Sequence, residues 1–543
     1  MNKTTTLLLC IAAITVQSCK NAPNILVEIE NPTLPILVEK EVNPVMRLDL
    51  IRVGSESYRL TEVELDLRGT TNITDITSVD FYEAKSDGSI NPNAFLATAS
   101  IENAKALFSN DLSIDKDTFT VWISAKLSMD ADIQHYLQIS CVSIQTDKGK
   151  LELPTVTPKQ LRFGKAVRQH MQDDVHTFRI PGLATSKQGT LLAIFDARYE
   201  SARDLQGHID IGLTRSVDGG YTWQPMQVVL DMKTWGNLPE KYNGVSDACI
   251  LVDDNTGDIY VAGLWMHGVL DGETGKWVEG LTQDSTRWIH QWQSKGSQPG
   301  FGVKQTSQFL ITKSTDDGLT WSEPVNITKI KNQDWWLFAP APGHGITLKD
   351  GTLVMPSQGR DKEGLPFSNI TWSKDQGKTW NTSEPAYNNT TECMAVELED
   401  GGIMLNMRDN RNRGNEENNG RRICVTYDLG KTWTEHPTSR NALIEPTCMA
   451  SIHKHTYTQN GEQKSLLLFM NPSSISTRDH LTLKVSFDDG MTWPEGNWIL
   501  LDEYRGRGYS CITSIDENAI GVLYESSQAD MVFQRVLLSE ILK

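Results

Sequence analysis

The sequence is poor in several features, and each shortage excludes a class of protein. Lys and Arg number 51 against 69 Asp and Glu, so the chain carries a net charge of −18. A nucleic-acid-binding protein needs the opposite balance, and we predict no nucleic-acid partner. After the first 20 residues, no apolar run approaches the roughly 18 residues that a transmembrane helix requires. The body of the protein is therefore predicted to lie outside the bilayer.

Cysteine is also scarce. Of the eight cysteines, Cys10 and Cys19 fall in the N-terminal segment, and the other six form no C-x-x-C pair. Six in a chain of 543 residues are too few for a disulfide scaffold, so buried free thiols are the simpler interpretation. The sequence contains no G-x-S-x-G, Walker or H-E-x-x-H motif, which leaves serine esterases, NTPases and zincins without support. We predict no metal and no cofactor.

The N-terminus has the pattern of an export signal. Lys3 precedes an apolar run from Leu7 to Val16, which ends three residues before Cys19. The segment resembles a bacterial lipobox, in which Cys19 becomes the lipidated first residue, and an ordinary cleavage site nearby is the alternative. We expect residues 1–19 to be a signal peptide and the protein to be exported. Its location would be the periplasm, the outer membrane or the cell surface, anchored by lipid or secreted.

An eight-residue pattern, S-x-D-x-G-x-T-W, occurs five times with small variations. Its aspartates are Asp218, Asp316, Asp375, Asp428 and Asp488. In a turn, the Asp and Ser/Thr side chains can accept bonds from backbone amides, the Gly can adopt a positive φ and the Trp can cover the hairpin. The last three intervals, of 53 to 60 residues, suit one four-stranded propeller blade each. The first interval, of 98 residues, has room for an additional blade without the motif.

Residues 24 to about 158 lack this motif but alternate apolar and polar residues in short runs, as at 45–51, 62–67 and 135–141. Such alternation predicts half-buried strands. We expect a β-sandwich over 45–158, acting either as a glycan-binding module or as a spacer. Residues 20–44, rich in Pro and Glu, are interpreted as a linker.

The repeated motifs resemble the Asp boxes of the sialidase (neuraminidase) superfamily, and the resemblance covers roughly residues 160–543. It implies an all-β protein with a six-bladed β-propeller catalytic domain at 159–543, preceded by the β-sandwich. Asp boxes also occur in secreted propellers without hydrolase activity. They therefore favour the fold more strongly than the chemistry.

Three arginines lie in segments that resemble the family's motifs. They are Arg179 in Phe178-Arg-Ile-Pro181, Arg408 in Leu405-Asn-Met-Arg408, and Arg478. An acidic protein that binds a sugar acid must gather positive charge locally, and guanidinium pairs with a carboxylate in a bidentate manner. The resemblance implies that all three converge on the substrate carboxylate.

The same resemblance suggests the acid/base, the nucleophile and its helper. Asp204 is the implied acid/base, with Glu200 and Asp210 as alternatives. Tyr509, in Gly506-Arg-Gly-Tyr-Ser510, is the implied nucleophile. Glu392, which precedes Cys393, is the implied base that activates the tyrosine, and Glu397 is the weaker candidate.

A tyrosine nucleophile suits a sugar that carries a carboxylate on its anomeric carbon. An Asp or Glu would approach one anion with another, whereas a neutral phenol avoids this repulsion. The phenol has an ordinary pKa near 10 and needs a base, which Glu392 would supply.

Further residues are implied with less support from their motifs. Arg198 and Asp247 resemble the pair that contacts a ring substituent of the sugar, and Glu525 resembles the residue that supports Arg179. Three aromatic residues are candidates either for the pocket lining or for the blade cores. They are Trp265, Trp336 and Phe338.

Together these features predict an exo-α-sialidase that acts on sialylated glycans with retention, through a covalent glycosyl-tyrosine. Two alternatives stay open: a trans-sialidase that transfers the sugar to another glycan or within the same molecule, and an inactive propeller that binds glycans. The inactive form would be expected to lack Asp204, Glu392 or Tyr509, all of which are present. We expect a monomer.

Overall fold

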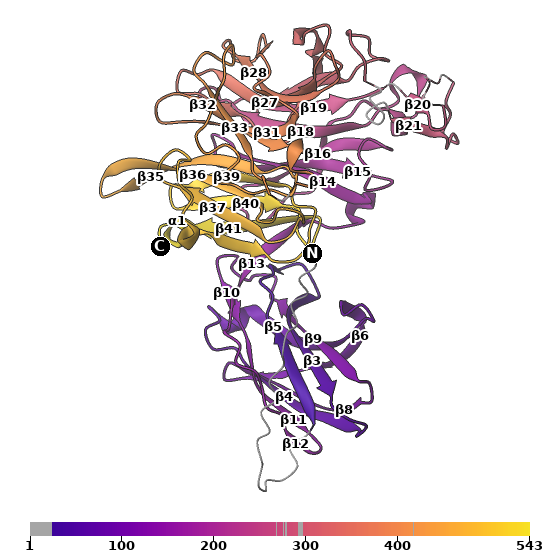
Figure 1. The fold of residues 1–543 in the computed structure, drawn as a ribbon, viewed down its shortest axis with the longest axis vertical. Helices are drawn as coiled ribbons and strands as arrows, with labels where there is room; N and C mark the ends of the chain where they lie inside the picture. Colours follow the sequence, from indigo (N-terminus) through magenta and orange to yellow (C-terminus); the bar gives the residue numbers. More distant parts are fainter. Residues whose placement is uncertain are drawn as a thin grey trace, which may run out of the picture.

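The computed structural model describes residues 24–267, 269–274, 276, 278, 280–290, 297–415 and 417–543. Within these residues the regular structure is almost entirely β, with one short α-helix, α1 (Leu538–Ile541). Figure 1 shows an N-terminal sandwich, coloured indigo to purple, below a larger propeller. The all-β prediction is confirmed. No helix in the described residues has the length and hydropathy to cross a membrane.

The sandwich consists of two sheets with a common core. The first has the order β1 (Ile25–Glu30), β3 (Asn43–Arg52), β9 (Thr118–Leu127), β5 (Ile76–Ala84), β6 (Ile90–Thr98). The second has the order β12 (Gly149–Lys150), β11 (Ser140–Thr146), β4 (Tyr58–Asp66), β8 (Lys105–Ile114), β7 (Ser100–Glu102). Val121 and Ile123 of β9 and Val63 and Leu65 of β4 are buried in this core. Their spacing of two residues is the strand period that the sequence shows.

The predicted linker over 20–44 is wrong from residue 25 onward. The run Ile25–Glu30 alternates apolar and polar residues, and β1 pairs with β3 along its whole length. The prolines on either side of this run and the glutamates within it obscured the strand pattern in the sequence. β2 (Ile36–Leu37) then pairs with β13 (Gln160–Arg168) of the propeller. The predicted signal peptide and Cys19 lie outside the described residues.

In the part of the chain that the structure describes, the propeller has six four-stranded antiparallel sheets. Blade 1 is β14 (Thr177–Thr185), β15 (Leu191–Arg198), β16 (Ile209–Ser216), β17 (Gln227–Leu230). Blade 2 is β18 (Val245–Val252), β19 (Ile259–Trp265), β22 (Gln308–Ser314), β23 (Val325–Asn326). Blade 3 is β24 (Leu337–Pro340), β27 (Leu353–Arg360), β28 (Pro366–Ser373), β29 (Asn381–Thr382).

The remaining blades follow in chain order until the ring closes. Blade 4 is β31 (Thr390–Glu397), β32 (Ile403–Asp409), β33 (Arg422–Thr426), β34 (Thr434–Glu435). Blade 5 is β35 (Ser451–Gln459), β36 (Glu462–Pro472), β37 (Leu481–Ser486), β38 (Ile499–Asp502). Blade 6 is β39 (Ser510–Asp516), β40 (Ala519–Tyr524), β41 (Met531–Leu537), β13. The first strands of blades 4, 5, 6, 1, 2 and 3 contact one another in that order around the axis, and β27 of blade 3 contacts β31 of blade 4.

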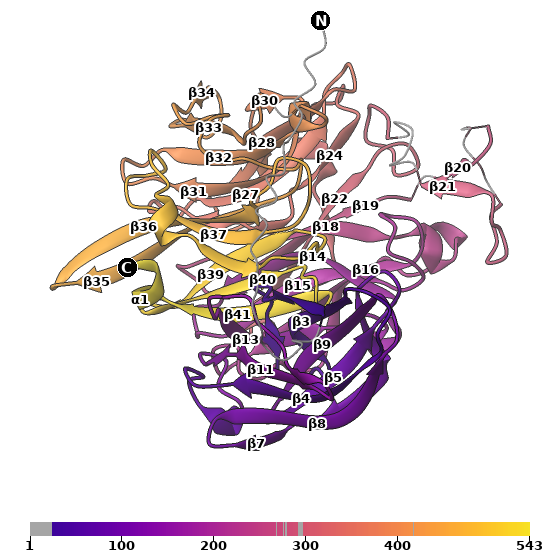
Figure 2. The same cartoon turned by 60° about the horizontal axis from the view of Figure 1, so that its bottom comes forward.

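Short strands supplement these sheets. β25 (Gly343–His344) pairs with β18, β26 (Ile346–Thr347) with β27, β30 (Tyr387–Asn388) with β28, and β10 (Tyr136–Gln138) with β13. β20 (Val269–Asp271) and β21 (Trp288–His290) form a separate hairpin, which projects from blade 2 (Figure 2).

Each Asp box forms the turn between the third and fourth strands of its blade. In blade 1, the amide of Gly220 donates to Ser216 Oγ at 2.9 Å, and the amide of Thr222 donates to Asp218 Oδ1 at 2.9 Å. The other four boxes make the same pair of bonds. Gly220 has a φ of 98°, which the missing Cβ permits. The predicted turn is confirmed.

The additional blade suggested for the 98-residue interval is wrong. That interval runs from the Asp box of blade 1 to the Asp box of blade 2. It is long because blade 2 carries the β20–β21 hairpin as an insertion. The blade without an Asp box is blade 6, whose fourth strand is β13. In blade 6, pairing with a strand from the beginning of the domain takes the place of the Asp-box turn.

Candidate active site

Three inner strands are bulged where they present candidate residues. The pairing of β14 with its neighbour shifts between residues 179 and 182, and that of β18 shifts between 246 and 249. The pairing of β31 shifts between 390 and 393. These bulges carry Arg179, Asp247 and Glu392. Asp247 has a φ of 55°, and Ile180, next to Arg179, has a φ of 62°. A β-branched residue in this region is strained, and such strain concentrates at functional sites.

Tyr509 lies just before β39 and contacts Glu392. Its hydroxyl donates to Glu392 Oε1 and accepts a bond from Arg408 Nη1 at 3.1 Å. The same Arg408 nitrogen lies 2.5 Å from Glu392 Oε2. Burial, followed by the charge of Glu392, raises the pKa of Tyr509 well above its ordinary value. The phenol is therefore neutral and already bonded to the carboxylate that can accept its proton.

Glu525, which follows β40, orders the opposite side of the tyrosine. Its carboxylate lies 2.5 Å from Arg179 Nε and accepts the amides of Ile180 at 2.9 Å and Tyr509 at 3.1 Å. Burial alone would raise its pKa, but the charge of Arg179 and these bonds outweigh burial and lower it. A buried carboxylate thus fixes both Arg179 and the backbone of Tyr509.

The three predicted arginines surround Tyr509. The guanidinium carbon of Arg179 lies 5.3 Å from the ring centroid, and that of Arg478 lies 5.5 Å from it. Arg478 comes from the loop between β36 and β37 and donates to the carbonyl of Arg507 at 2.9 Å. Arg408 contributes a buried Nε that has no hydrogen-bond partner among the described residues. The arrangement concentrates positive charge in a chain of net negative charge.

Asp204 lies on the loop between β15 and β16. Arg198 Nη1 donates to its carboxylate at 2.6 Å, and Arg198 Nη2 donates to Asp196 at 2.8 Å. Asp196 also accepts the hydroxyl of Ser246 at 2.6 Å. The Asp204 side chain is 60% exposed, so a ligand can reach it.

The charges around Asp204 set its pKa. Partial desolvation by the surrounding protein raises that pKa, but the charges of Arg198 and then Arg179 outweigh it, and the net shift is downward. Asp247 differs, because burial and the negative charges of Glu392, Asp196 and Asp204 raise its pKa well above the ordinary value. Asp247 also accepts a bond from Gln358 Nε2 at 3.3 Å.

Comparison with known proteins shows the family of the chain. Residues 180–504 match the BNR repeat-like domain, and residues 24–121 match the N-terminal domain of BNR-repeat neuraminidase. A sialidase of Bacteroides fragilis is 38% identical over 541 residues, covering 94% of each protein. The chain belongs to the sialidase family. It is a glycoside hydrolase of that family.

Solved structures share the fold of this sialidase to different extents. The Hadza microbial sialidase Hz136 has a TM-score of 0.84 and 34% identity, covering 94% of this chain and 99% of that one. The intramolecular trans-sialidase from Ruminococcus gnavus, solved with oseltamivir carboxylate, has a TM-score of 0.53 and 17% identity. It covers 68% of this chain and 97% of its own, and the likeness concerns the fold alone.

Several sequence candidates lie elsewhere in the sialidase. Glu397 is at the opposite end of β31 from Glu392 and accepts the amide of Lys349. Trp265 and Phe338 are buried in blade cores, and Trp336 donates its indole N–H to the carbonyl of Lys362. All six cysteines of the described region are free, as the sequence analysis favoured, and five of them are buried.

Other residues of the site carry no motif that the sequence analysis used. Asp196 and Gln358 hold Arg198 and Asp247, and buried Glu445 pairs with Arg421 and accepts the amide of Asp409, next to Arg408. Their signal in the sequence was weak, because each acts through the partner that it holds and not through a motif of its own.

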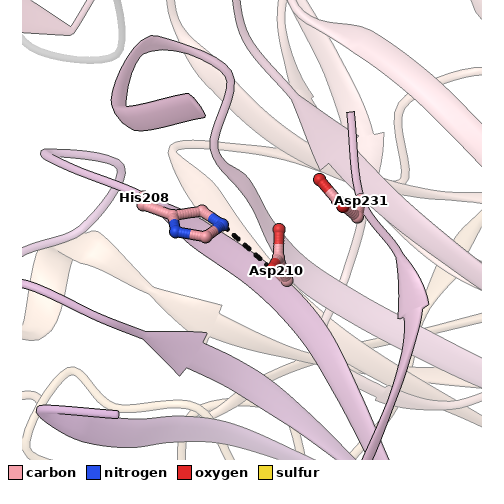
Figure 3. A group of neighbouring side chains, drawn as sticks. All are labelled: His208, Asp210 and Asp231. Carbon is pink, nitrogen blue, oxygen red and sulfur yellow. Dashed lines mark hydrogen bonds and ion pairs between the residues drawn. The ribbon is translucent and has the colours of Figure 1, made fainter. Parts of the chain in front are cut away.

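His208, Asp210 and Asp231 form a separate polar group beside the Asp204 loop. Figure 3 shows the imidazole directed at Asp210, with Asp231 next to them. One ligand atom from each residue lies within 4.8 Å of the others, a spacing that can hold a cation. Asp210 lies 3.0 Å from His208 Nε2 and is 4% exposed, so a substrate can reach it less readily than Asp204.

Proposed function

We propose that this sialidase is an exo-α-sialidase that removes terminal sialic acids from glycoproteins, glycolipids or oligosaccharides by hydrolysis with retention. The observation that carries the proposal is the phenol of Tyr509, bonded to Glu392 and surrounded by Arg179, Arg408 and Arg478. This arrangement combines an activated neutral nucleophile with a binding site for a carboxylate.

The arginines bind the carboxylate of the sugar and so place its anomeric carbon over Tyr509. Arg179 is held from behind by Glu525, and Arg478 by a backbone carbonyl. Fixed guanidinium groups lose little freedom when the substrate binds, which favours binding of a rigid anion. Arg198 and Asp247 are placed to contact other substituents of the ring.

In the first step, Tyr509 Oη forms a bond to the anomeric carbon while the bond to the leaving oxygen breaks. Glu392 accepts the phenolic proton, and Asp204 donates a proton to the leaving oxygen. In the second step, Asp204 removes a proton from water, which attacks the anomeric carbon. Glu392 then returns the proton to the departing tyrosine oxygen. Two inversions give net retention.

Asp204 must be protonated for the first step, whereas its pKa in the free enzyme is lowered. The substrate brings a carboxylate close to arginines that lower the pKa of Asp204. This added negative charge offsets part of their effect and raises the pKa of Asp204 in the complex. Substrate binding thus promotes protonation of the acid.

The test is the release of sialic acid from sialyllactose, with the first-formed anomer followed by NMR. We expect the α-anomer first, and losses of orders of magnitude in Tyr509→Phe and Asp204→Ala. A β-anomer first would contradict retention. An anhydro product or a sialylated acceptor would instead identify a trans-sialidase, and binding without turnover would identify a glycan-binding propeller.

Export and anchoring form a second part of the proposal. The apolar run before Cys19 supports cleavage there and lipidation of that cysteine. We expect the wild type to fractionate with membranes and Cys19→Ala to be released or retained as unprocessed precursor. Absence of covalently bound fatty acid from the wild type, or the same fatty-acid labelling of both proteins, would contradict lipid anchoring. Size-exclusion chromatography with light scattering tests the proposed monomer.

A further inference from the structure

The loop that carries Asp204 is fastened at several points. Leu205, next to Asp204, is 2% exposed and packs against Leu264, Met266 and Leu337. It has a φ of 50°, in the region that side chains avoid. A nonpolar anchor therefore holds a strained backbone directly beside the proposed acid/base.

The other end of the loop closes around His208. Gly207 has a φ of 131°, and a Cβ there would lie 2.2 Å from Glu200 Oε2. The same Glu200 oxygen accepts the amide of His208, and the carbonyl of His208 accepts the amide of Tyr199 at 3.1 Å. The imidazole stacks on the Tyr199 ring, with 4.1 Å between centroids and 13° between planes. Tyr199 follows Arg198, the residue that holds Asp204.

His208 also joins segments that lead to different parts of the site. Its Nε2 lies 3.0 Å from Asp210 on β16, and its Nδ1 lies 3.7 Å from Glu240. Asp231 directly follows β17 and lies beside Asp210 (Figure 3). Glu240 begins a short 3-10 helix, Glu240–Tyr242, just before β18, which carries Asp247. One side chain thus links the Asp204 loop to the approach of the Asp247 strand.

The charges around the imidazole favour its cationic form. Asp210, Asp231 and Glu240 face it, Glu200 lies beside its amide, and Tyr199 covers its ring. Among the described residues, no Lys or Arg forms an ion pair with these carboxylates. Burial lowers the pKa of His208, but the bond to Asp210 and the acidic neighbours outweigh burial, so the net shift is upward.

We infer that His208 is a positioning residue for the acid/base: its imidazolium fixes the loop that presents Asp204 to the leaving oxygen. The inference rests on the proposed role of Asp204. Loss of the charge should leave the nucleophile and the arginines intact but misplace the proton donor. Because a small misplacement impairs proton transfer more than binding, kcat should fall and KM should change little.

The leaving group distinguishes this role from general loss of structure. A phenolic leaving group, as in a 4-methylumbelliferyl sialoside, departs without full protonation, whereas the sugar alcohol of sialyllactose requires the acid. We expect His208→Gln to lower kcat on sialyllactose about 10- to 100-fold and on the aryl sialoside less than about threefold. Asp231→Asn should show the same pattern more weakly. Asp204→Ala should show it more strongly.

The matched control is His436→Gln, which changes a half-buried histidine of blade 4 that is bonded to Thr438. It should retain wild-type kcat on both substrates.

Four outcomes would overturn the inference. An equal fall in kcat on both substrates would assign His208 a structural role. If Asp204→Ala shows the leaving-group pattern but His208→Gln does not, His208 is not a positioning residue, and the proposed function stands. If Asp204→Ala also lacks the pattern, Asp204 is not the acid/base, and the inferred role of His208 is wrong with it. Stoichiometric metal, measured by elemental analysis of the wild type and lost in His208→Gln, would identify a metal site instead.

Discussion

At the scale of single residues, the neutral phenol of Tyr509 is the centre of the site. One carboxylate, Glu392, accepts its hydroxyl proton, and three guanidinium groups surround it. In the proposed mechanism, the cations that bind the anionic sugar also stabilise the developing negative charge on the tyrosine oxygen. Recognition of the substrate and activation of Tyr509 would then use the same arginines.

Tyr509→Phe removes only the hydroxyl and should keep the fold. We expect kcat to fall by at least about 10³-fold, because among the described residues Tyr509 alone donates a hydroxyl hydrogen bond to Glu392. The melting temperature should stay within a few degrees of the wild type. Steady-state kinetics and calorimetry measure both quantities, and retention of more than a tenth of the wild-type kcat would exclude Tyr509 as the nucleophile.

Glu525→Gln tests the support of Arg179. The substitution leaves a buried guanidinium without its charged partner, which costs about 3–5 kcal/mol in comparable buried pairs. We expect a lower melting temperature and a KM raised about tenfold, since Arg179 would no longer be fixed. The control is Glu540→Gln, which breaks the ion pair with Arg162. It should lower the melting temperature and leave KM unchanged.

The pH dependence of catalysis tests the electrostatics of Asp204. A general acid loses activity as the pH rises through its pKa, and Arg198 and Arg179 lower that pKa in the free enzyme against the effect of partial desolvation. The carboxylate of the substrate offsets these charges. We expect the basic limb of kcat at higher pH than the basic limb of kcat/KM. Coincident limbs would contradict the proposed coupling.

At the scale of elements, the Asp box was predictable because its bonds are local. Ser216, Asp218, Gly220 and Thr222 lie within seven residues of one another and bond mainly to each other. The assignment of blades was less predictable, because blade 6 closes when β13 pairs with β41, more than 300 residues away. No local pattern records such a pairing, and the long first interval was misread as an extra blade.

The same distinction applies to the site. The motif arginines, Tyr509 and Glu392 lie together in space, and the resemblance had identified them. Asp196, Gln358 and His208 were missed, because their importance depends on the side chains they contact and not on their neighbours in sequence. Trp265 and Phe338 show the converse: their residue type suits a pocket, but the pleat of their strands directs them into blade cores.

An Asp box can be weakened without changing the site. Asp488→Ala removes the acceptor of the Thr492 amide and hydroxyl at the rim of blade 5. We expect destabilisation of roughly 1 kcal/mol, because solvent compensates partly for these exposed bonds, and unchanged kcat. Chemical denaturation with Asp218→Ala and the double variant should show additive effects. A loss of kcat in Asp488→Ala at full folding would contradict a purely structural box.

At the scale of the whole molecule, the sandwich and the propeller share a seam along β13. This strand completes blade 6 and also pairs with β2 and β10 of the N-terminal region. Lys165 of β13 binds Glu39 at 2.8 Å, and Lys40 donates to the carbonyl of Gln528 at 2.6 Å. The N-terminal region therefore covers the strand that closes the ring.

Removal of residues 1–158 tests whether this cover acts on stability or on catalysis. None of the proposed site residues contacts the sandwich through a bond of the described residues, so kcat on a small aryl sialoside should stay within about threefold of wild type. The melting temperature should fall, because β13 loses two pairing partners and exposes apolar surface. Tyr136→Phe in the full chain, which removes one bond to Glu540 across the seam, should lower it less. If the truncated protein is folded yet loses kcat more than tenfold, the sandwich must contribute to the site, and its role as a cover is wrong.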